Sequence, residues 1–241
     1  MSLFSCMVRR PSVDARDRAA PRVRIRPLHR VEFLHLSDEG ADTVPVANLS
    51  VTGMGVLRDP RHRWPEPGGA VAGRLVVGTD HHELSARVVH RTGEIVGCAF
   101  TDPPREIAAS IHEHLGAELA AAGLEPVPGD ELAAPADGTP RVFHGPNNCM
   151  LHLVERGGRV LRFSLAFLGH YLEGGERLPV RFGVVTRDGD VTAGGHGAGD
   201  GDPVLWADMI DAELLASTIR FVSAIPHLTP EQRDGVLHFI Y

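Results

Sequence analysis

Between Val31 and Phe100 the chain alternates short apolar runs with polar positions. The alternation is clearest over Val71–Val77 and Leu84–Val88, where every second residue is apolar or small. A period of two predicts half-buried β-strands. We predict six strands in this region, over Val31–Leu36, Val44–Ala47, Met54–Leu57, Ala70–Val77, Leu84–His90 and Ile95–Phe100.

The turns between these strands are short. Arg91–Glu94 sits between two strand-like runs, and its Gly93 can adopt the backbone conformation that a tight hairpin loop needs. Six short strands joined in this way indicate a small antiparallel barrel or sandwich.

A helix is predicted directly after the last of these strands. Asp102 is a good N-cap and Pro103 a good first helical residue. Apolar residues then recur at a spacing of four, which places them on one helical face, and we expect that face to lie against the sheet: Ile107, Ile111, Leu115 and Leu119.

The second half of the chain reads as a separate α+β domain over residues 141–241. Its predicted strands are Cys149–Val154, Val160–Leu168 and Leu178–Val185, followed by a glycine-rich loop over 193–201 and a helix around Trp206–Ile225. Thr229 and Gln232 form a capping-box pattern that opens a last helix. The aromatic residues of this half are most simply its core, with a protein-binding patch as the alternative.

These patterns predict four segments. Residues 1–14 are a flexible leader and 15–122 a β-rich domain with its trailing helix. Residues 123–140 are a proline-rich linker, and 141–241 are an output or interaction domain.

Charge is distributed unevenly. The chain has 24 basic residues, all of them arginine, and eight lie in the first 30 residues, which carry a net charge of +6. The remainder carries −13, so a general nucleic-acid binder, which spreads positive charge over a surface, is disfavoured. A basic arm on an acidic body suits a small anionic ligand better.

Membrane insertion and an oxidising compartment are not indicated. No apolar run approaches 18 residues, and the first residues have the wrong order for a signal peptide. The three cysteines are widely spaced, so we expect a reduced, cytoplasmic chain without a disulfide framework.

A candidate binding motif follows the arginines. Asn48 and Ser50 are two residues apart on an extended segment, so their polar groups point to the same side, and Gly53 allows close approach of a ligand. Arginine forks bind phosphate or the acceptor edge of guanine. Four or five charge-assisted hydrogen bonds, less the cost of ordering the arm, predict binding in roughly the micromolar range.

Three stretches together resemble a PilZ domain. They are Arg18-Ala-Ala-Pro-Arg22-Val, Asn48-Leu-Ser-Val-Thr-Gly53-Met-Gly55 and Val96-Gly-Cys-Ala-Phe100. The resemblance covers residues 15–122 and implies a six-stranded β-barrel that binds the bacterial second messenger cyclic di-GMP. It also implies that the arginines hold the phosphates and guanines, while Asn48, Ser50 and Gly53 line the other side of the site.

The frame of the arginine motif is open. R-x-x-x-R is satisfied by Arg18/Arg22, by Arg22/Arg26 and by Arg26/Arg30. Pro21-Arg22-Val23 before the alternating residues favours the first frame. Arg22 belongs to the first two frames, so the candidate ligand-binding arginines are Arg18, Arg22 and Arg26.

Other clusters are given structural interpretations. His196, Asp200 and Asp202 fit no Ca²⁺ loop or P-loop, and the two histidines of His112-Glu113-His114 point to different faces of a solvated helix. Cys149 is expected to be a buried thiol rather than a nucleophile paired with His144 or His152. No catalytic residue, metal ligand or cofactor is predicted, and the chain is not expected to be an enzyme.

The resulting functional hypothesis is a cyclic di-GMP receptor. It relays binding to its C-terminal domain, which contacts a protein partner; the oligomeric state and the process controlled are left open. The alternative is a PilZ-like scaffold that no longer binds the nucleotide and acts through protein–protein contacts.

Overall fold

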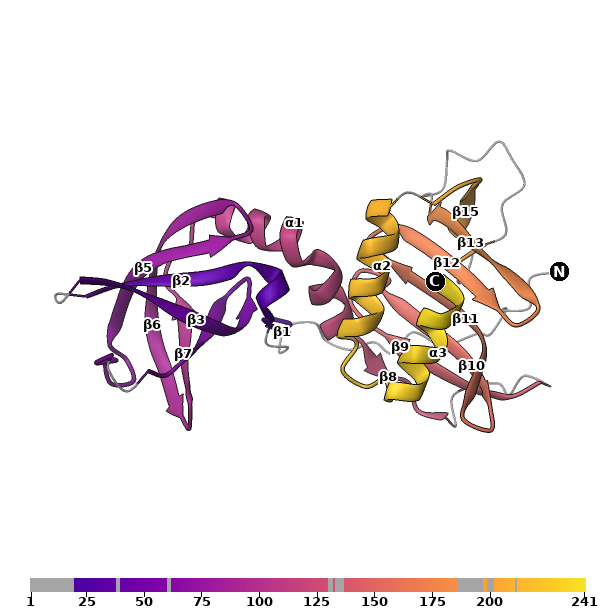
Figure 1. The fold of residues 1–241 in the computed structure, drawn as a ribbon, viewed down its shortest axis with the longest axis horizontal. Helices are drawn as coiled ribbons and strands as arrows, with labels where there is room; N and C mark the ends of the chain where they lie inside the picture. Colours follow the sequence, from indigo (N-terminus) through magenta and orange to yellow (C-terminus); the bar gives the residue numbers. More distant parts are fainter. Residues whose placement is uncertain are drawn as a thin grey trace. The chain divides into compact units, whose positions relative to one another are not determined.

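The computed structural model describes residues 20–37, 40–59, 62–129, 132, 137–185, 197–198, 202–210 and 212–241. The chain divides into two compact units, one over residues 18–119 and one formed mainly by residues 120–241 (Figure 1). The predicted leader over residues 1–14 lies outside the described residues. Among the residues described, no helix combines the length and the apolar character needed to cross a bilayer.

The first unit is a closed antiparallel barrel. Its six strands run around it in the order β3-β2-β5-β6-β7-β4, and pairing of β4 with β3 closes the ring. The strands are β2 (Val31–Ser37), β3 (Gly40–Ser50), β4 (Gly53–Leu57), β5 (Ala70–Val77), β6 (Asp80–Thr92) and β7 (Ile95–Phe100). The predicted six-stranded barrel is confirmed, and the predicted bounds of β5 and β7 are those observed.

Alternation along β5 shows how the sequence builds the barrel interior. Val71, Leu75 and Val77 are buried in the core, and the intervening Ala72 and Arg74 are exposed. Gly73 lies on the same inward side. A Cβ there would come within 2.4 Å of the Leu34 carbonyl oxygen, so the position has no room for a side chain. The missing side chain therefore lets the backbones pack closely.

A bulge in β3 changes which residues face the core. Val44 and Val46 point inward, the register of β3 against β4 shifts between Val46 and Asn48, and Leu49 is then the next fully buried residue. The extra residue reverses the alternation, as β-bulges do. Asn48, which precedes Leu49, therefore points away from the core, whereas Ser50 is buried where β3 turns into β4.

Helix α1 (Arg105–Ala122) follows the barrel. Ile107, Ile111, Leu115 and Leu119 are all buried in the barrel core cluster, which confirms the predicted apolar face. The helix begins later than predicted. Asp102 has a φ of +44°, outside the geometry of an N-cap, and the first helical residue is Arg105.

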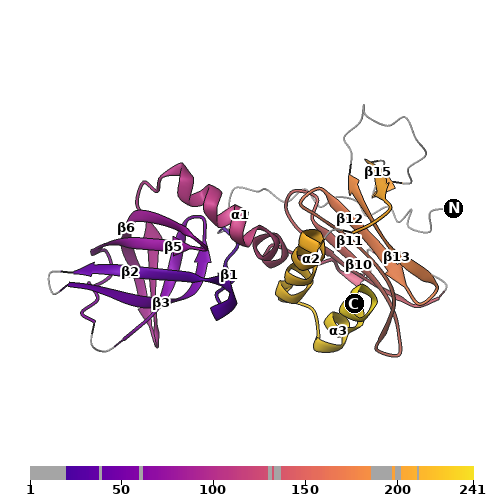
Figure 2. The same cartoon turned by 45° about the horizontal axis from the view of Figure 1, so that its top comes forward.

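The second unit is an antiparallel sheet with two helices. The sheet order is β14-β15-β13-β12-β11-β10-β9-β8, and α2 (Ala212–Ala224) and α3 (Pro230–Ile240) lie on one face (Figure 2). The strands are β8 (Glu125–Pro126), β9 (Thr139–His144), β10 (Met150–Arg156), β11 (Arg159–Phe167), β12 (His170–Gly175), β13 (Leu178–Val185), β14 (Gly197–Ala198) and β15 (Asp202–Ala207).

Aromatic contacts join this sheet to its helices. Phe167 of β11 stacks on Phe221 of α2 with ring centroids 4.5 Å apart, and Phe163 stacks on Phe239 of α3 at 6.1 Å. Phe163, Phe167 and Phe221 are almost completely buried. The core interpretation of these three aromatic residues is therefore confirmed.

Two expectations for this half are corrected. Trp206 does not begin a helix: it lies in β15, opposite Gly183 of β13, and α2 starts only at Ala212. Strands β8, β9, β12 and β14 were not predicted either. The run of β12 ends in Gly174-Gly175 and lacks clear alternation. Thr229 does cap α3 as predicted, accepting a hydrogen bond from the Gln232 backbone N–H at 3.2 Å.

Candidate functional site

The arginine segment is attached to the motif strand by a short extra strand. β1 (Val23–Arg24) pairs with β3 at Leu49 and Asn48. The pairing of β2 with β3 ends at Pro45, so β1 occupies the same edge of β3 further along the strand. The Ile25 backbone N–H also donates to the Ala47 carbonyl at 2.9 Å. The segment before the barrel thus lies directly beside Asn48.

A side-chain hydrogen bond joins the two predicted motifs. Nη1 of Arg22 donates to Oδ1 of Asn48 at 3.1 Å, across 26 residues of sequence. The structure therefore brings Arg22 and Asn48 together, although their binding role stays a prediction.

Three arginines share one side of this segment. Val23 is buried and Ile25 packs against the barrel core, so Arg22, Arg24 and Arg26 point outward on an extended backbone, and all three are exposed. The sequence analysis missed Arg24. The alternation Arg-Val-Arg-Ile-Arg is the signal that could have identified it. Arg18 lies outside the described residues.

The Asn48 side chain lies over Gly55 of β4, which has no side chain. Asn48 pairs with Gly55 of β4, where a Cβ would come within 2.6 Å of Asn48 Nδ2. A larger residue at 55 would displace this amide. Gly55 therefore helps to set the orientation of Asn48.

Ser50 and Gly53 hold the turn between β3 and β4. The Ser50 hydroxyl donates to the Gly53 carbonyl at 3.1 Å and accepts from the Thr52 backbone N–H at 3.4 Å, and Ser50 is fully buried. A Cβ on Gly53 would come within 2.4 Å of the Cys98 carbonyl oxygen. Both residues thus have a structural reason to be in the motif, and their contact with a ligand stays a prediction.

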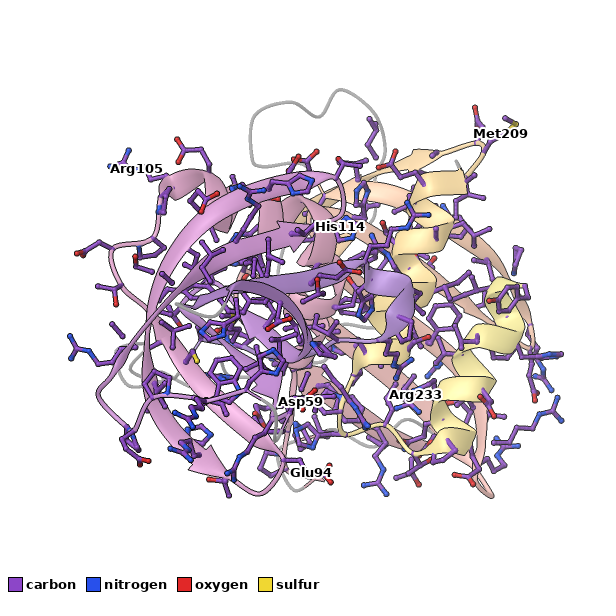
Figure 3. All side chains as sticks on the ribbon, turned by 60° about the vertical axis from the view of Figure 1, so that its left-hand side comes forward. Asp59, Glu94, Arg105, His114, Met209 and Arg233 are labelled. Carbon is purple, nitrogen blue, oxygen red and sulfur yellow. The ribbon has the colours of Figure 1, made fainter. Side chains whose placement is uncertain are left out.

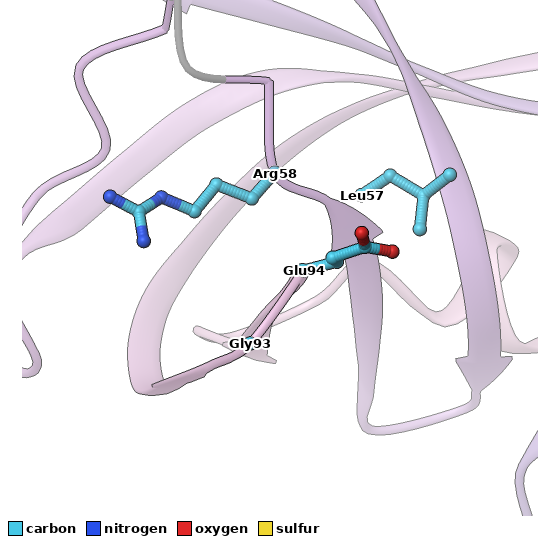
Figure 4. Close-up of a pocket in the computed structure, with 4 residues that line it drawn as sticks. All are labelled: Leu57, Arg58, Gly93 and Glu94. Carbon is cyan, nitrogen blue, oxygen red and sulfur yellow. The ribbon is translucent and has the colours of Figure 1, made fainter.

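A surface hollow lies elsewhere on the barrel. It has a volume of about 620 Å³ and is lined by Leu57, Arg58, Gly93 and Glu94 (Figure 4). Of the predicted ligand-binding residues that the structure describes, none lines it. The candidate site is consequently an exposed strand edge bearing three guanidinium groups.

The other candidate clusters have ordinary structural surroundings where they are described. Burial raises the pKa of the Cys149 thiol and lowers that of His144, and it lowers the pKa of His152 to about 4. No group of three or more histidine, cysteine or acidic side chains among the described residues is arranged to hold a metal ion. His196 and Asp200, and the side chain of Asp202, lie outside the described part.

One helix residue departs from its expected surroundings. His112 is exposed as predicted, but His114 is partly buried, and its Nε2 lies 2.7 Å from the His29 carbonyl oxygen. The expectation that both histidines are solvated is therefore wrong for His114, since His29 and Gly78 of the barrel unit lie beside it.

No protein-family model matches the chain, and no curated protein matches it. Among solved structures, it is similar to an uncharacterised Legionella protein, with 14% identity and a TM-score of 0.29 over 39% of this chain and 89% of the other. It is also similar to the PilZ domain of CeSA from a cellulose-synthesizing bacterium, with 21% identity and a TM-score of 0.28 over 36% and 90% of the two chains. The description of the barrel therefore rests on its own strand order.

Proposed function

We propose that the first unit is a receptor for cyclic di-GMP, the ligand that the resemblance to PilZ domains implies. The observation that carries this proposal is the hydrogen bond between Arg22 and Asn48. It joins the two halves of the motif across 26 residues, as a site shared by both halves requires.

The chemistry of the exposed edge suits this ligand. A cyclic dinucleotide of guanine offers two phosphates and two guanine edges with paired acceptors, and arginine binds both groups through two parallel N–H donors. Arg22, Arg24 and Arg26 supply three such forks on one side. Arg18 adds a fourth in the favoured frame.

The expected affinity follows from these contacts. Charge-assisted hydrogen bonds contribute about 1.5–3 kcal/mol each. Four of them, less the free energy of ordering the arm and the ligand, correspond to a dissociation constant in roughly the micromolar range. In this proposal Asn48 contacts the nucleotide, and Ser50 and Gly53 act by holding the β3–β4 turn in place.

The second unit is proposed as the output module of a bacterial cytoplasmic receptor. It contacts a protein partner when the nucleotide is bound.

Isothermal titration of cyclic di-GMP into the full chain tests the receptor proposal. We expect micromolar binding, and a loss of at least about tenfold in affinity for Arg22→Ala, because one charge-assisted contact is removed. Arg87→Ala, which removes an exposed arginine of β6, is the matched control and should bind like the parent chain.

Two results would contradict the proposal. The absence of both binding heat and a thermal shift at about 1 mM nucleotide would exclude a useful affinity and leave the scaffold hypothesis. Equal losses in Arg22→Ala and Arg87→Ala would indicate non-specific charge attraction instead of a site.

A further inference from the structure

The arginine segment continues into a short, well-fixed connection. After Arg26 the chain forms the 3₁₀ turn η1 (Pro27–His29), in which the Arg26 backbone N–H donates to Nδ1 of His29 at 3.0 Å. Arg30 then adopts a left-handed conformation with a φ of +48°, and its carbonyl accepts from the Gly78 N–H at 3.0 Å. Proline and the pairing with β5 leave this connection little freedom.

His29 of this turn contacts α1 twice. Its Nε2 lies 3.6 Å from Oε1 of Glu118, and its carbonyl oxygen accepts a hydrogen bond from Nε2 of His114 at 2.7 Å. His29 and Glu118 are 7% and 3% exposed. Figure 3 shows His114 on α1 beside the barrel strands.

These two contacts lie on either side of an irregularity in the helix. Leu115, between His114 and Glu118, has a non-helical φ of −121° and ψ of 16°. Its side chain is fully buried in the barrel core cluster. The helix is thus bent at the point where η1 is attached, and its last residues, from Ala120, belong to the second unit.

Burial makes the His29–Glu118 contact difficult to separate. A carboxylate withdrawn from water is costly unless it is paired, so a movement that separates a buried pair is unfavourable. If η1 shifts, Glu118 must therefore shift with it or lose this partner. Packed elements joined in this way move between discrete arrangements.

We propose that His29, with Glu118 and His114, transmits occupancy of the arginine segment to the C-terminal part of α1, residues 116–122. This inference rests on the proposed function, because it takes cyclic di-GMP as the ligand that restrains Arg22 and Arg26. The restraint passes through β1 and η1 to His29, and from His29 to the helix that leads out of the barrel.

Hydrogen–deuterium exchange of the full chain with and without saturating cyclic di-GMP tests the relay. We expect the ligand to slow exchange of residues 116–122 at least about fivefold, the lower range of measured couplings between sites. In Glu118→Gln this slowing should disappear, while titration still detects binding. Glu113→Gln, an exposed carboxylate on the same helix, is the matched control and should retain the slowing.

The outcomes separate the two proposals. Absence of binding in the parent chain overturns the receptor proposal and the relay with it. Binding without any change over residues 116–122, or a change of equal size in Glu118→Gln, overturns the relay alone and leaves His29–Glu118 as an anchor of the helix. If Glu118→Gln melts far below the parent chain, His114→Leu is used in its place. His114→Leu removes the contact between His114 and the His29 carbonyl and keeps the buried His29–Glu118 pair. An undiminished slowing of exchange in His114→Leu also overturns the relay.

Discussion

Gly53 and Gly55, two residues apart on β4, lack a side chain for different physical reasons. A Cβ on Gly53 would meet the backbone of the neighbouring strand β7, with the Cys98 carbonyl oxygen at 2.4 Å. The atoms nearest to a Cβ on Gly55 would belong to the Asn48 side chain, with Nδ2 at 2.6 Å. Backbone cannot yield without moving a strand, whereas an amide group can rotate away.

Alanine at the two positions should therefore have separable effects. We expect Gly53→Ala to lower the free energy of unfolding by about 1–3 kcal/mol, the usual cost of overpacking. Gly55→Ala should cost less stability but weaken cyclic di-GMP binding, because it displaces the Asn48 amide. Urea unfolding and titration of both variants measure these quantities. If Gly53→Ala is as stable as the parent chain, β4 and β7 can move apart to accept a Cβ at no cost in stability, and this prediction is wrong.

At the scale of elements, the β9–β10 pair contains a buried titratable group. His152 and His144 stack with ring centroids 5.7 Å apart, and their Nε2 atoms are 3.5 Å from each other. Burial, followed by the charge of His144, lowers the pKa of His152 from 6.5 to about 4. The folded second unit therefore favours neutral His152.

Stability of the second unit should consequently fall in mild acid. The unfolded chain takes up a proton near pH 6.5 and the folded chain only near pH 4, so the stabilisation is complete above the first value and is lost progressively between the two. The loss is about 3 kcal/mol, from the size of the pKa shift. Urea unfolding at several pH values, followed by Trp206 fluorescence in a Trp64→Phe background, measures it.

A substitution tests whether His152 is responsible. His152→Gln should reduce this pH dependence, whereas His112→Gln, which alters an exposed histidine of α1, should leave it unchanged. An unchanged slope in His152→Gln would assign the effect to other groups.

At the scale of the whole molecule, charge is the main feature. The chain carries −7 overall, yet its first 30 residues carry +6. The arginine segment therefore attracts an anionic ligand locally while the rest of the protein repels it. In the proposed complex, salt would screen exposed charges of both kinds, and the short arginine–phosphate contacts would contribute most to the affinity.

Nucleotide affinity should accordingly fall with ionic strength. We expect a decrease of about tenfold between about 50 mM and 500 mM NaCl, in the direction expected when arginines neutralise phosphates. Titration across this range measures it, with potassium glutamate as a second salt to exclude a chloride effect. An affinity independent of salt would indicate that base stacking or apolar contacts dominate binding.

Local patterns in the sequence were sufficient to predict most elements of the barrel. Alternation predicts β5, a short apolar run after Gly93 predicts β7, and the spacing of Ile107 and Ile111 predicts the buried face of α1. In the second unit, Thr229 with Gln232 likewise predicts the start of α3. Each of these signals depends on residues within about two turns or one strand of each other, so no distant partner is needed to interpret it.

Contacts between distant residues were decided only by the tertiary structure. The pairing of β1 with β3, the Arg22–Asn48 hydrogen bond and the His29–Glu118 pair join residues far apart in sequence, and no local pattern encodes them. Trp206 shows the same limit, since its pairing with Gly183 makes a strand of a segment that alone resembles a helix start. The sequence by itself therefore determined the elements and the residue types of the candidate site, whereas packing determined which of those residues meet, because long-range contacts depend on how the whole chain closes.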